Sequence, residues 1–221
     1  MIMVEWPTYL VYDCLGFIVA LTGNEVLLAA FTLGDTIYLL VESVFMGLGT
    51  FMRTELNITI GENNVVSFRK KAKSLFFSTL LIGFSTLLVQ VIAIEILLAT
   101  DFIENEELRE EFDDIQYYLY TMTLYQAVDI YLVVMTKGLG YLSVLSISNI
   151  VSNFVMIVLA YYLAITRNWG IWGAQFSNFL SLFYRVLLLL WLNFIKLDFK
   201  KELQRIRNQK LKREEMYKKE K

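Results

Sequence analysis

Six long apolar stretches constrain the fold of this 221-residue chain more than any other feature. A transmembrane helix needs about 20 mostly apolar residues. Stretches of this kind cover about residues 1–22, 26–52, 74–100, 115–136, 141–166 and 171–195. Because the bilayer interior holds no water, each segment has to satisfy its own backbone hydrogen bonds as a helix. We therefore expect an all-α membrane protein, with six transmembrane helices in residues 1–196 and a tail at 197–221.

The composition supports this class and argues against several others. Apolar residues make up 57% of the chain and charged residues 19%, whereas a soluble domain carries about a quarter charged residues. The chain has one Cys and no His, which argues against a disulfide framework, a structural zinc site and His-dependent hydrolysis. The net charge of −2 gives no basic field for nucleic acid. We expect no enzyme, no cofactor, no bound metal and no nucleic-acid partner.

The distribution of charge predicts an orientation. Short cytoplasmic loops carry an excess of Lys and Arg. In a six-span chain the N-terminus, 53–73, 137–140 and the end of the chain from Lys196 onward share one side, and they hold 17 of the 20 basic residues. The connection 101–114 on the other side holds eight acids. Both termini are therefore expected in the cytoplasm, and the basic tail is either a solvated end or an amphipathic helix on anionic lipid. The sequence does not distinguish a plasma from a vacuolar membrane.

Several ionisable residues fall inside the expected spans. A charged side chain at a lipid-facing helix centre costs about 2.5–3.5 kcal/mol on insertion scales. Such residues are therefore expected to face a cavity, to pair with one another or to lie near an interface. The residues concerned are Asp13, Asp35, Glu42, Glu95, Asp129 and Arg185.

Helical spacing groups some of these residues on common faces. Asp35 and Glu42 are seven residues apart, and Gln126 and Asp129 are three apart, so each pair shares a helix face. Two acid-bearing faces that converge on a cavity would bind a cation or a proton, which is the chemistry of a coupled transporter. The structural alternatives are that Glu95, near the end of its span, reaches water and that Arg185 neutralises one of the acids.

Short motifs in a fixed order give the chain a family resemblance. Each lies at the corresponding place between the same expected spans. The motifs are Glu5-Trp6 with Tyr9, Gly47-Leu48-Gly49 through Arg53, Asn57 and Gly61-Glu62-Asn63-Asn64, the basic run 69–73, Lys137-Gly138-Leu139-Gly140, Asn149 with Asn153, and Gly170-Ile171-Trp172-Gly173-Ala174. Together they resemble the C-terminal six-helix half of eukaryotic multidrug and toxin extrusion (MATE) transporters, over about residues 5–200.

This resemblance implies one lobe of a MATE-like bundle and a secondary active antiporter. In that family, inflow of H⁺ or Na⁺ drives efflux of organic cations and other xenobiotics. The resemblance places coupling acids at Glu5, with Asp13 as an alternative, and at Asp35. The tenth-helix acid of the family is replaced here by Gln126, which cannot exchange a proton, and Asp129 lies one turn further on.

The family has twelve helices and this chain has six expected spans, so three readings stay open. The chain is a fragment, a truncated product, or a half that pairs with a second six-helix lobe as a homo- or heterodimer. The alternative functions are a non-transporting membrane interaction protein, such as a remnant half, and a lipid-linked oligosaccharide flippase. The acidic character of the spans argues against the flippase.

Overall fold

The described residues of the chain form helices and no strands. The computed structural model describes residues 13–62, 64–100, 103–196, 201–202, 204–206 and 208. Residues 13–20 are helical, and the longer elements follow in the order α2 (Glu25–Gly61), α3 (Val65–Ala99), α4 (Glu106–Gly138), α5 (Leu142–Ala160) and α6 (Gly170–Leu190). The last two helices each end in a π-helical turn, Tyr161–Thr166 and Trp191–Lys196.

Asparagine side chains start three of the helices. The Oδ1 atom of Asn24 accepts hydrogen bonds from the backbone N–H of Val26 at 2.9 Å and of Leu27 at 3.2 Å. Asn64 caps α3 in the same way, and Asn105 accepts from one backbone N–H at the start of α4. Each side chain satisfies N–H groups that have no partner within the first helical turn.

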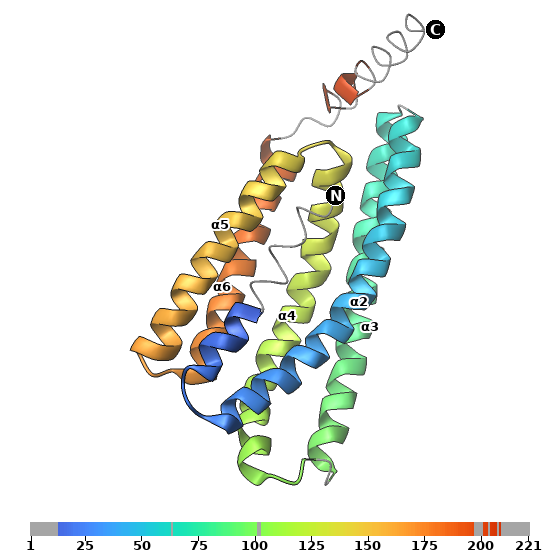
Figure 1. Ribbon diagram of the computed structural model, residues 1–221. Helices are drawn as coiled ribbons and strands as arrows, with labels where there is room; N and C mark the ends of the chain where they lie inside the picture. Colours follow the sequence, from blue (N-terminus) through green and yellow to red (C-terminus); the bar gives the residue numbers. More distant parts are fainter. Residues whose placement is uncertain are drawn as a thin grey trace, which may run out of the picture.

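The helix α4 lies at the centre of the arrangement. It contacts α2 and α3 on one side and α6 and α5 on the other. Figure 1 shows α4 between the α2/α3 pair and the α5/α6 pair. Side chains from all of these helices therefore meet around α4, which is where the candidate site lies.

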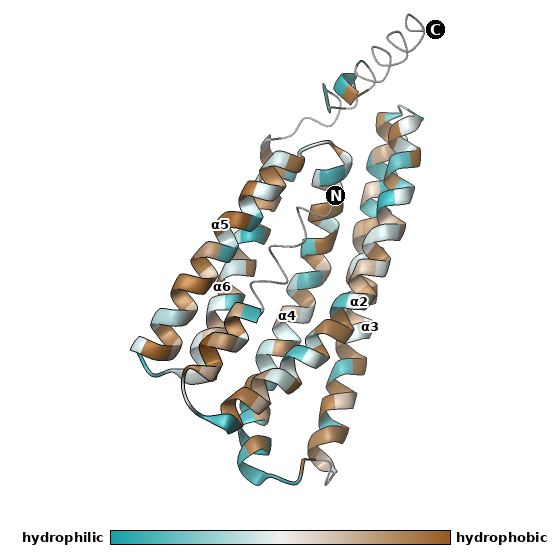
Figure 2. Ribbon diagram, in the orientation of Figure 1, coloured by the Kyte–Doolittle hydropathy of each residue, from teal (hydrophilic) through white to brown (hydrophobic). Residues whose placement is uncertain are grey.

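Four of the helical segments are long and apolar enough to cross a bilayer. They are Glu25–Gly61, Val65–Ala99, Leu142–Thr166 and Gly170–Ile195. The outer surface of α3 carries a row of exposed apolar side chains at helical spacing, including Phe77, Leu81, Phe84 and Leu88. This is the surface expected of a helix whose solvent is lipid. Figure 2 shows hydrophobic residues along much of α3 and α5, and hydrophilic residues at the end of α4 near α2.

The four segments support the membrane class, whereas the count of six spans stays a prediction. The expected first span, 1–22, falls largely on residues outside the described part of the chain. The expected fourth span, 115–136, lies within α4, which is not among the four apolar segments. Because α4 is surrounded by other helices, its polar side chains find partners in protein. Thr123, for example, donates a 2.6 Å hydrogen bond to Gln90 of α3.

Two of the expected connections between spans are largely helical. The expected connection 53–73 is helical almost throughout, because α2 continues to Gly61 and α3 begins at Val65. The expected connection 101–114 is helical from Glu106 onwards. Hydropathy indicates where a helix leaves the apolar part of the bilayer. It does not indicate where the helix ends, because Lys, Arg and Glu are good helix formers and a helix that contains them continues into water.

Glycines allow the closest helix contacts. A Cβ atom on Gly83 of α3 would lie 2.7 Å from the Ala127 Cβ of α4, and one on Gly49 of α2 would lie 2.8 Å from the Ile130 side chain. A Cβ atom on Gly173 of α6 would lie 2.5 Å from a backbone atom of the preceding π-helical turn. Small residues at such contacts are typical of helix packing in membranes.

The expected basic tail, 197–221, lies largely outside the described residues. Residues 201–202, 204–206 and 208 are helical. The Arg205 guanidinium donates a 2.9 Å hydrogen bond to the Leu139 carbonyl, and the Tyr141 hydroxyl donates a 2.6 Å hydrogen bond to Glu202. This part of the tail is therefore held against the turn between α4 and α5.

Candidate functional site

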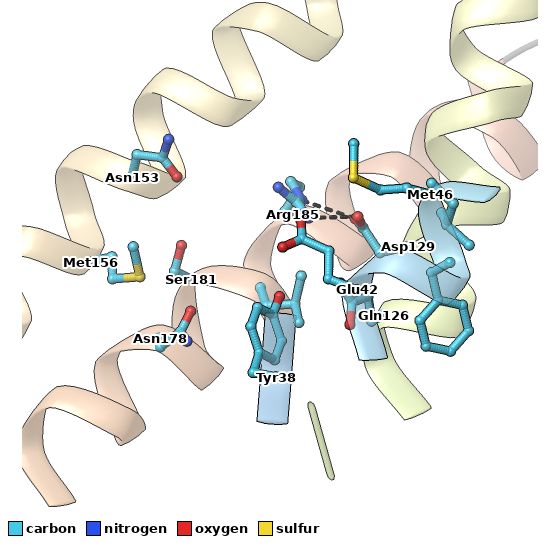
Figure 3. A pocket seen from close by; sticks show the side chains of 13 residues that line it. Tyr38, Glu42, Met46, Gln126, Asp129, Asn153, Met156, Asn178, Ser181 and Arg185 are labelled. Atoms are coloured by element: carbon cyan, nitrogen blue, oxygen red, sulfur yellow. Dashed lines mark hydrogen bonds and ion pairs between the residues drawn. The ribbon is translucent and has the colours of Figure 1, made fainter. Parts of the chain in front are cut away.

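A polar cavity of about 100 Å³ lies where α2, α4, α5 and α6 meet. Figure 3 shows the side chains around it, with Glu42, Gln126 and Asp129 on one side and Asn153 and Met156 on the other. Its polar and charged lining residues among those described are Tyr38, Glu42, Gln126, Asp129, Asn153, Asn178, Ser181 and Arg185.

Helical periodicity brings each element's polar side chains to this cavity. Asn178, Ser181 and Arg185 follow one another at intervals of three and four residues on α6. Tyr38 and Glu42 are four residues apart on α2. Because residues three, four and seven apart share a helix face, α2, α4 and α6 each present a short row of polar side chains to the cavity.

An ion pair between α4 and α6 lies in the wall of the cavity. The Arg185 Nε donates to Asp129 Oδ1 at 2.9 Å, and the Arg185 Nη2 donates to Asp129 Oδ2 at 2.5 Å. The two side chains are 17% and 8% exposed. A two-point contact of this kind fixes the guanidinium in the plane of the carboxylate, and it offsets the cost of burying either charge alone. In the structure Arg185 therefore pairs with Asp129, as in the structural alternative that the sequence left open for this residue.

Glu42 is the second carboxylate that lines the cavity among the described residues. It is half-buried on α2. Arg185, Asp35 and Asp129 all lie close enough to act on it electrostatically. The cavity thus combines a fixed ion pair with a carboxylate from a different helix, and its charge depends on whether that carboxylate holds a proton or a cation.

Two carboxamides in the cavity carry buried atoms without a hydrogen-bond partner. They are Oε1 of Gln126, on α4, and Nδ2 of Asn153, on α5. Both residues are 8% exposed. By contrast, the Ser181 hydroxyl donates a 2.9 Å hydrogen bond to the Ser152 carbonyl. A buried polar atom left unpaired costs about 1–3 kcal/mol, so these two atoms call for water or a ligand in the cavity.

The structure brings together three of the six residues that the sequence nominated. Glu42, Gln126 and Asp129 line one cavity. Asp35 is half-buried and lines a much smaller space of about 10 Å³, whose wall shares Tyr38 and Asn178 with the main cavity.

The other acids of the expected spans lie elsewhere. Asp13 is exposed, although it is within electrostatic range of Asp35. Glu5 lies outside the described residues. Glu95 is exposed and lines a separate surface pocket beside the acidic start of α4, in agreement with the alternative that it reaches water.

Sequence reasoning missed several lining residues. Tyr38, Asn178 and Ser181 contribute polar groups to the cavity and were not nominated. The signal for the α6 residues was present, because Asn178 and Ser181 lie on the same helix face as Arg185. Asn153 was noticed only through the family resemblance. No group of three or more Cys, Asp or Glu side chains in the described part of the chain is arranged to hold a metal ion.

Comparison with known proteins identifies the fold. No protein-family model and no curated protein sequence matches the chain. Among solved structures, it matches a multidrug resistance MATE family transporter of the MOP superfamily, solved in an outward-facing conformation. The TM-score is 0.74 at 18% sequence identity, and the match covers 89% of this chain and 43% of that transporter. An identity this low shows the fold alone, and the neighbour is a transporter. The chain has the fold of one half of a MATE family transporter.

Proposed function

We propose that the chain is one lobe of a secondary active transporter that exports organic cations and other xenobiotics in exchange for H⁺ or Na⁺. The observation that carries this proposal is the convergence of Glu42 and Asp129, from different helices, on one polar cavity. Ionisable residues are expensive inside a membrane and commonly mark ion or proton pathways. The cavity also lies between helix pairs, as expected for a transporter whose parts move against each other.

The proposed coupling set consists of the acids nominated from the sequence, with unequal roles. Glu42 is the carboxylate that exchanges a proton or a cation, since Asp129 is held by two hydrogen bonds from Arg185. Asp35 lies next to the cavity and passes the charge along α2. Gln126 contributes an amide oxygen in place of the family's acid. Glu5 and Asp13 belong to the proposed set through the family resemblance.

The proposed functional unit contains a second six-helix lobe. The match covers 43% of the matched transporter's chain. Many transporters are built from repeated halves, with the substrate site at the interface between the repeats. A second copy of this chain or a different half would supply that lobe. We further propose six spans, one lobe at 1–196, and both termini with the basic tail in the cytoplasm, on the strength of the Lys/Arg bias.

Transport into sealed vesicles tests the proposal. The purified chain is reconstituted into liposomes, and uptake of a fluorescent organic cation is followed under an imposed pH gradient and, separately, under a Na⁺ gradient. We expect one of the two gradients to drive uptake. We expect Glu42→Gln and Asp35→Asn to reduce gradient-driven uptake at least tenfold. Glu95→Gln is the matched control, because it removes an acid that the structure places away from the cavity, and uptake should be unchanged.

Two outcomes count against the proposal. Uptake that ignores both gradients would exclude coupling, and equal losses in Glu95→Gln and Glu42→Gln would exclude a special role for the cavity. Native mass measurement in mild detergent complements this assay. A pair of lobes agrees with the proposed unit, whereas a stable single lobe without transport favours the non-transporting interaction protein.

A further inference from the structure

We propose that the first part of α3 is a binding site for an anionic phospholipid of the surrounding membrane. Lys70 and Lys73 hold the phosphate of the head group, and the acyl chains lie along the apolar face that begins at Phe77. This inference goes beyond the proposed function, because it concerns the bilayer around the chain and needs no transport activity. It follows from the exposed face of α3, from the length of that face and from the charge at each of its ends.

One face of α3 is exposed along the length of the helix. The helix packs against α4 and α2, and it lies at the edge of the arrangement in Figure 1. The apolar part of α3 is the least buried of the four apolar segments. Its exposed side chains follow one another at intervals of three or four residues, which places them on a common face. They are Lys70, Lys73, Phe77, Leu81, Phe84, Leu88, Ile92 and Ile96.

The apolar part of this face matches the thickness of a bilayer. It runs from Phe77 to Ile96, which are 19 positions apart. A rise of about 1.5 Å per residue separates them by about 28 Å along the helix axis. The hydrocarbon core of a typical bilayer is about 30 Å thick. In a bilayer that covers this face, the lysines that precede Phe77 therefore lie at the level of the lipid head groups.

Two lysines of the basic run lie on the lipid-facing side. Lys70 and Lys73 are exposed, and the Lys73 Nζ lies 6.0 Å from the centre of the Phe77 ring. Lys71, between them, pairs instead with Glu55 of α2. Neither Lys70 nor Lys73 forms an ion pair with a described residue. Two ammonium groups on flexible stems, next to an apolar surface, complement a phosphate that carries acyl chains.

The opposite end of the same face has the opposite charge. Glu95 is exposed at that end, and the surface pocket that it lines holds three more acids and one base, Glu106, Glu110, Asp113 and Arg109. Like charges repel, so a phosphate is disfavoured there. An anionic lipid is therefore favoured in one leaflet, at the basic end of α3. The Lys/Arg bias assigns this end to the cytoplasmic side, where the leaflet is rich in anionic lipids.

A second copy of the chain is the other candidate for covering this face. Close helix contacts in membranes are made by small residues. On α3 the glycine at such a contact, Gly83, lies on the opposite, buried face. The exposed face presents large side chains such as Phe77 and Leu81 instead. A partner chain would also have to bury the ammonium groups at the end of the face, whereas a lipid leaves them among head groups.

Two lipids with the same acyl chains test the inference on the wild-type chain. The full chain in mild detergent is titrated with dioleoyl phosphatidylglycerol or with dioleoyl phosphatidylcholine, and bound lipids are counted by native mass spectrometry. We expect the first phosphatidylglycerol to bind at a concentration about tenfold lower or less, because each Lys near an anionic surface contributes about fivefold. Glycerol phosphate, which has a phosphate and no acyl chains, should not displace the lipid.

Matched double variants and a reactive lipid locate the site. Lys70→Gln with Lys73→Gln should reduce the preference for phosphatidylglycerol at least fivefold. Lys218→Gln with Lys219→Gln removes the same charge from the tail and should leave the preference unchanged. A phosphatidylglycerol with a photoreactive diazirine at the end of one acyl chain should crosslink to residues 81–92 of the wild type, because the chain ends reach the middle of the bilayer. The Lys70/Lys73 variant should lose this crosslink.

Each other outcome overturns the inference. Equal binding of the two lipids to the wild type removes the role of the lysines, and a preference lost only in the tail variant moves the site to the tail. Displacement by glycerol phosphate means that a free phosphate is the ligand, and a crosslink only outside α3 means that another surface holds the lipid. A chain dimer without bound lipid means that a second copy covers the face. None of these measurements uses transport, so the proposed function stands or fails separately.

Discussion

The pair formed by Asp129 and Arg185 gives the sharpest quantitative prediction. Its geometry is two-point, with contacts of 2.9 and 2.5 Å, and its side chains are 8% and 17% exposed. Removing one partner of a buried pair strands the other charge and typically costs about 3–5 kcal/mol. Asp129→Asn and Arg185→Gln should therefore each lower the free energy of unfolding by about that amount. The double variant strands no charge and should lose clearly less than the sum.

A double-mutant cycle measures this coupling. Unfolding of the wild type, both single variants and the double variant is followed by circular dichroism in the same detergent. We expect an interaction energy of about 2–3 kcal/mol, the upper part of the range for groups in direct contact. The pair Glu55–Lys71, whose side chains are 28% and 41% exposed, is the matched control and should give about 0–1 kcal/mol. Additive losses at Asp129 and Arg185 would refute the argument that the pair is a buried unit.

Three further predictions concern packing, helix capping and pH. Gly173→Val should destabilise the chain by about 1–3 kcal/mol in thermal unfolding, because the new Cβ atom would lie 2.5 Å from the backbone of Ala164. Gly47→Ala is the control and should not destabilise the chain, because a Cβ atom at Gly47 meets no atom within 4 Å. Asn64→Ala should cost about 1 kcal/mol in the same assay, since two N–H groups at the start of α3 lose their acceptor, and an unchanged melting temperature would contradict that role. Burial, and then the neighbouring carboxylates of the acidic connection, raise the pKa of Glu111, which lies outside the proposed span 115–136. A carboxyl with a raised folded-state pKa contributes stability that is present below its unfolded pKa and is lost as pH rises through the folded pKa. Thermal stability should therefore fall more steeply in the wild type than in Glu111→Gln as pH rises above about 4, the ordinary pKa of a Glu carboxyl, and parallel curves would contradict the assignment.

The sequence carried much of the information on the fold. Long apolar stretches predicted the four apolar helical segments, because the length of a spanning helix follows from the thickness of the bilayer. The ends of the helices could not be predicted from hydropathy. The helix α2 continues past Arg53 to Gly61, since no residue before Gly61 interrupts the backbone and charged side chains are tolerated where a helix enters water.

The candidate site was predictable only in part. The three-residue spacing of Gln126 and Asp129 indicated a shared helix face, and both line the cavity. The seven-residue spacing of Asp35 and Glu42 likewise indicated one face of α2, but only Glu42 lines the main cavity. Two turns of helix separate the two side chains along the helix axis. Asp129, which pairs with Arg185, lies 56 residues away in the chain, and a tertiary contact of this kind has no signal in local spacing.

Charge exchange at the cavity is the central claim, and one measurement tests it most directly. Organic cation is added to the purified chain in detergent, and released H⁺ is followed with a pH indicator, with bound ²²Na⁺ counted in parallel. We predict that cation binding releases H⁺ or Na⁺ from the wild type and from Glu95→Gln, and that Glu42→Gln releases neither. Cation binding without release of either ion, or equal release from Glu42→Gln, would contradict the claim that the cavity exchanges one positive charge for another.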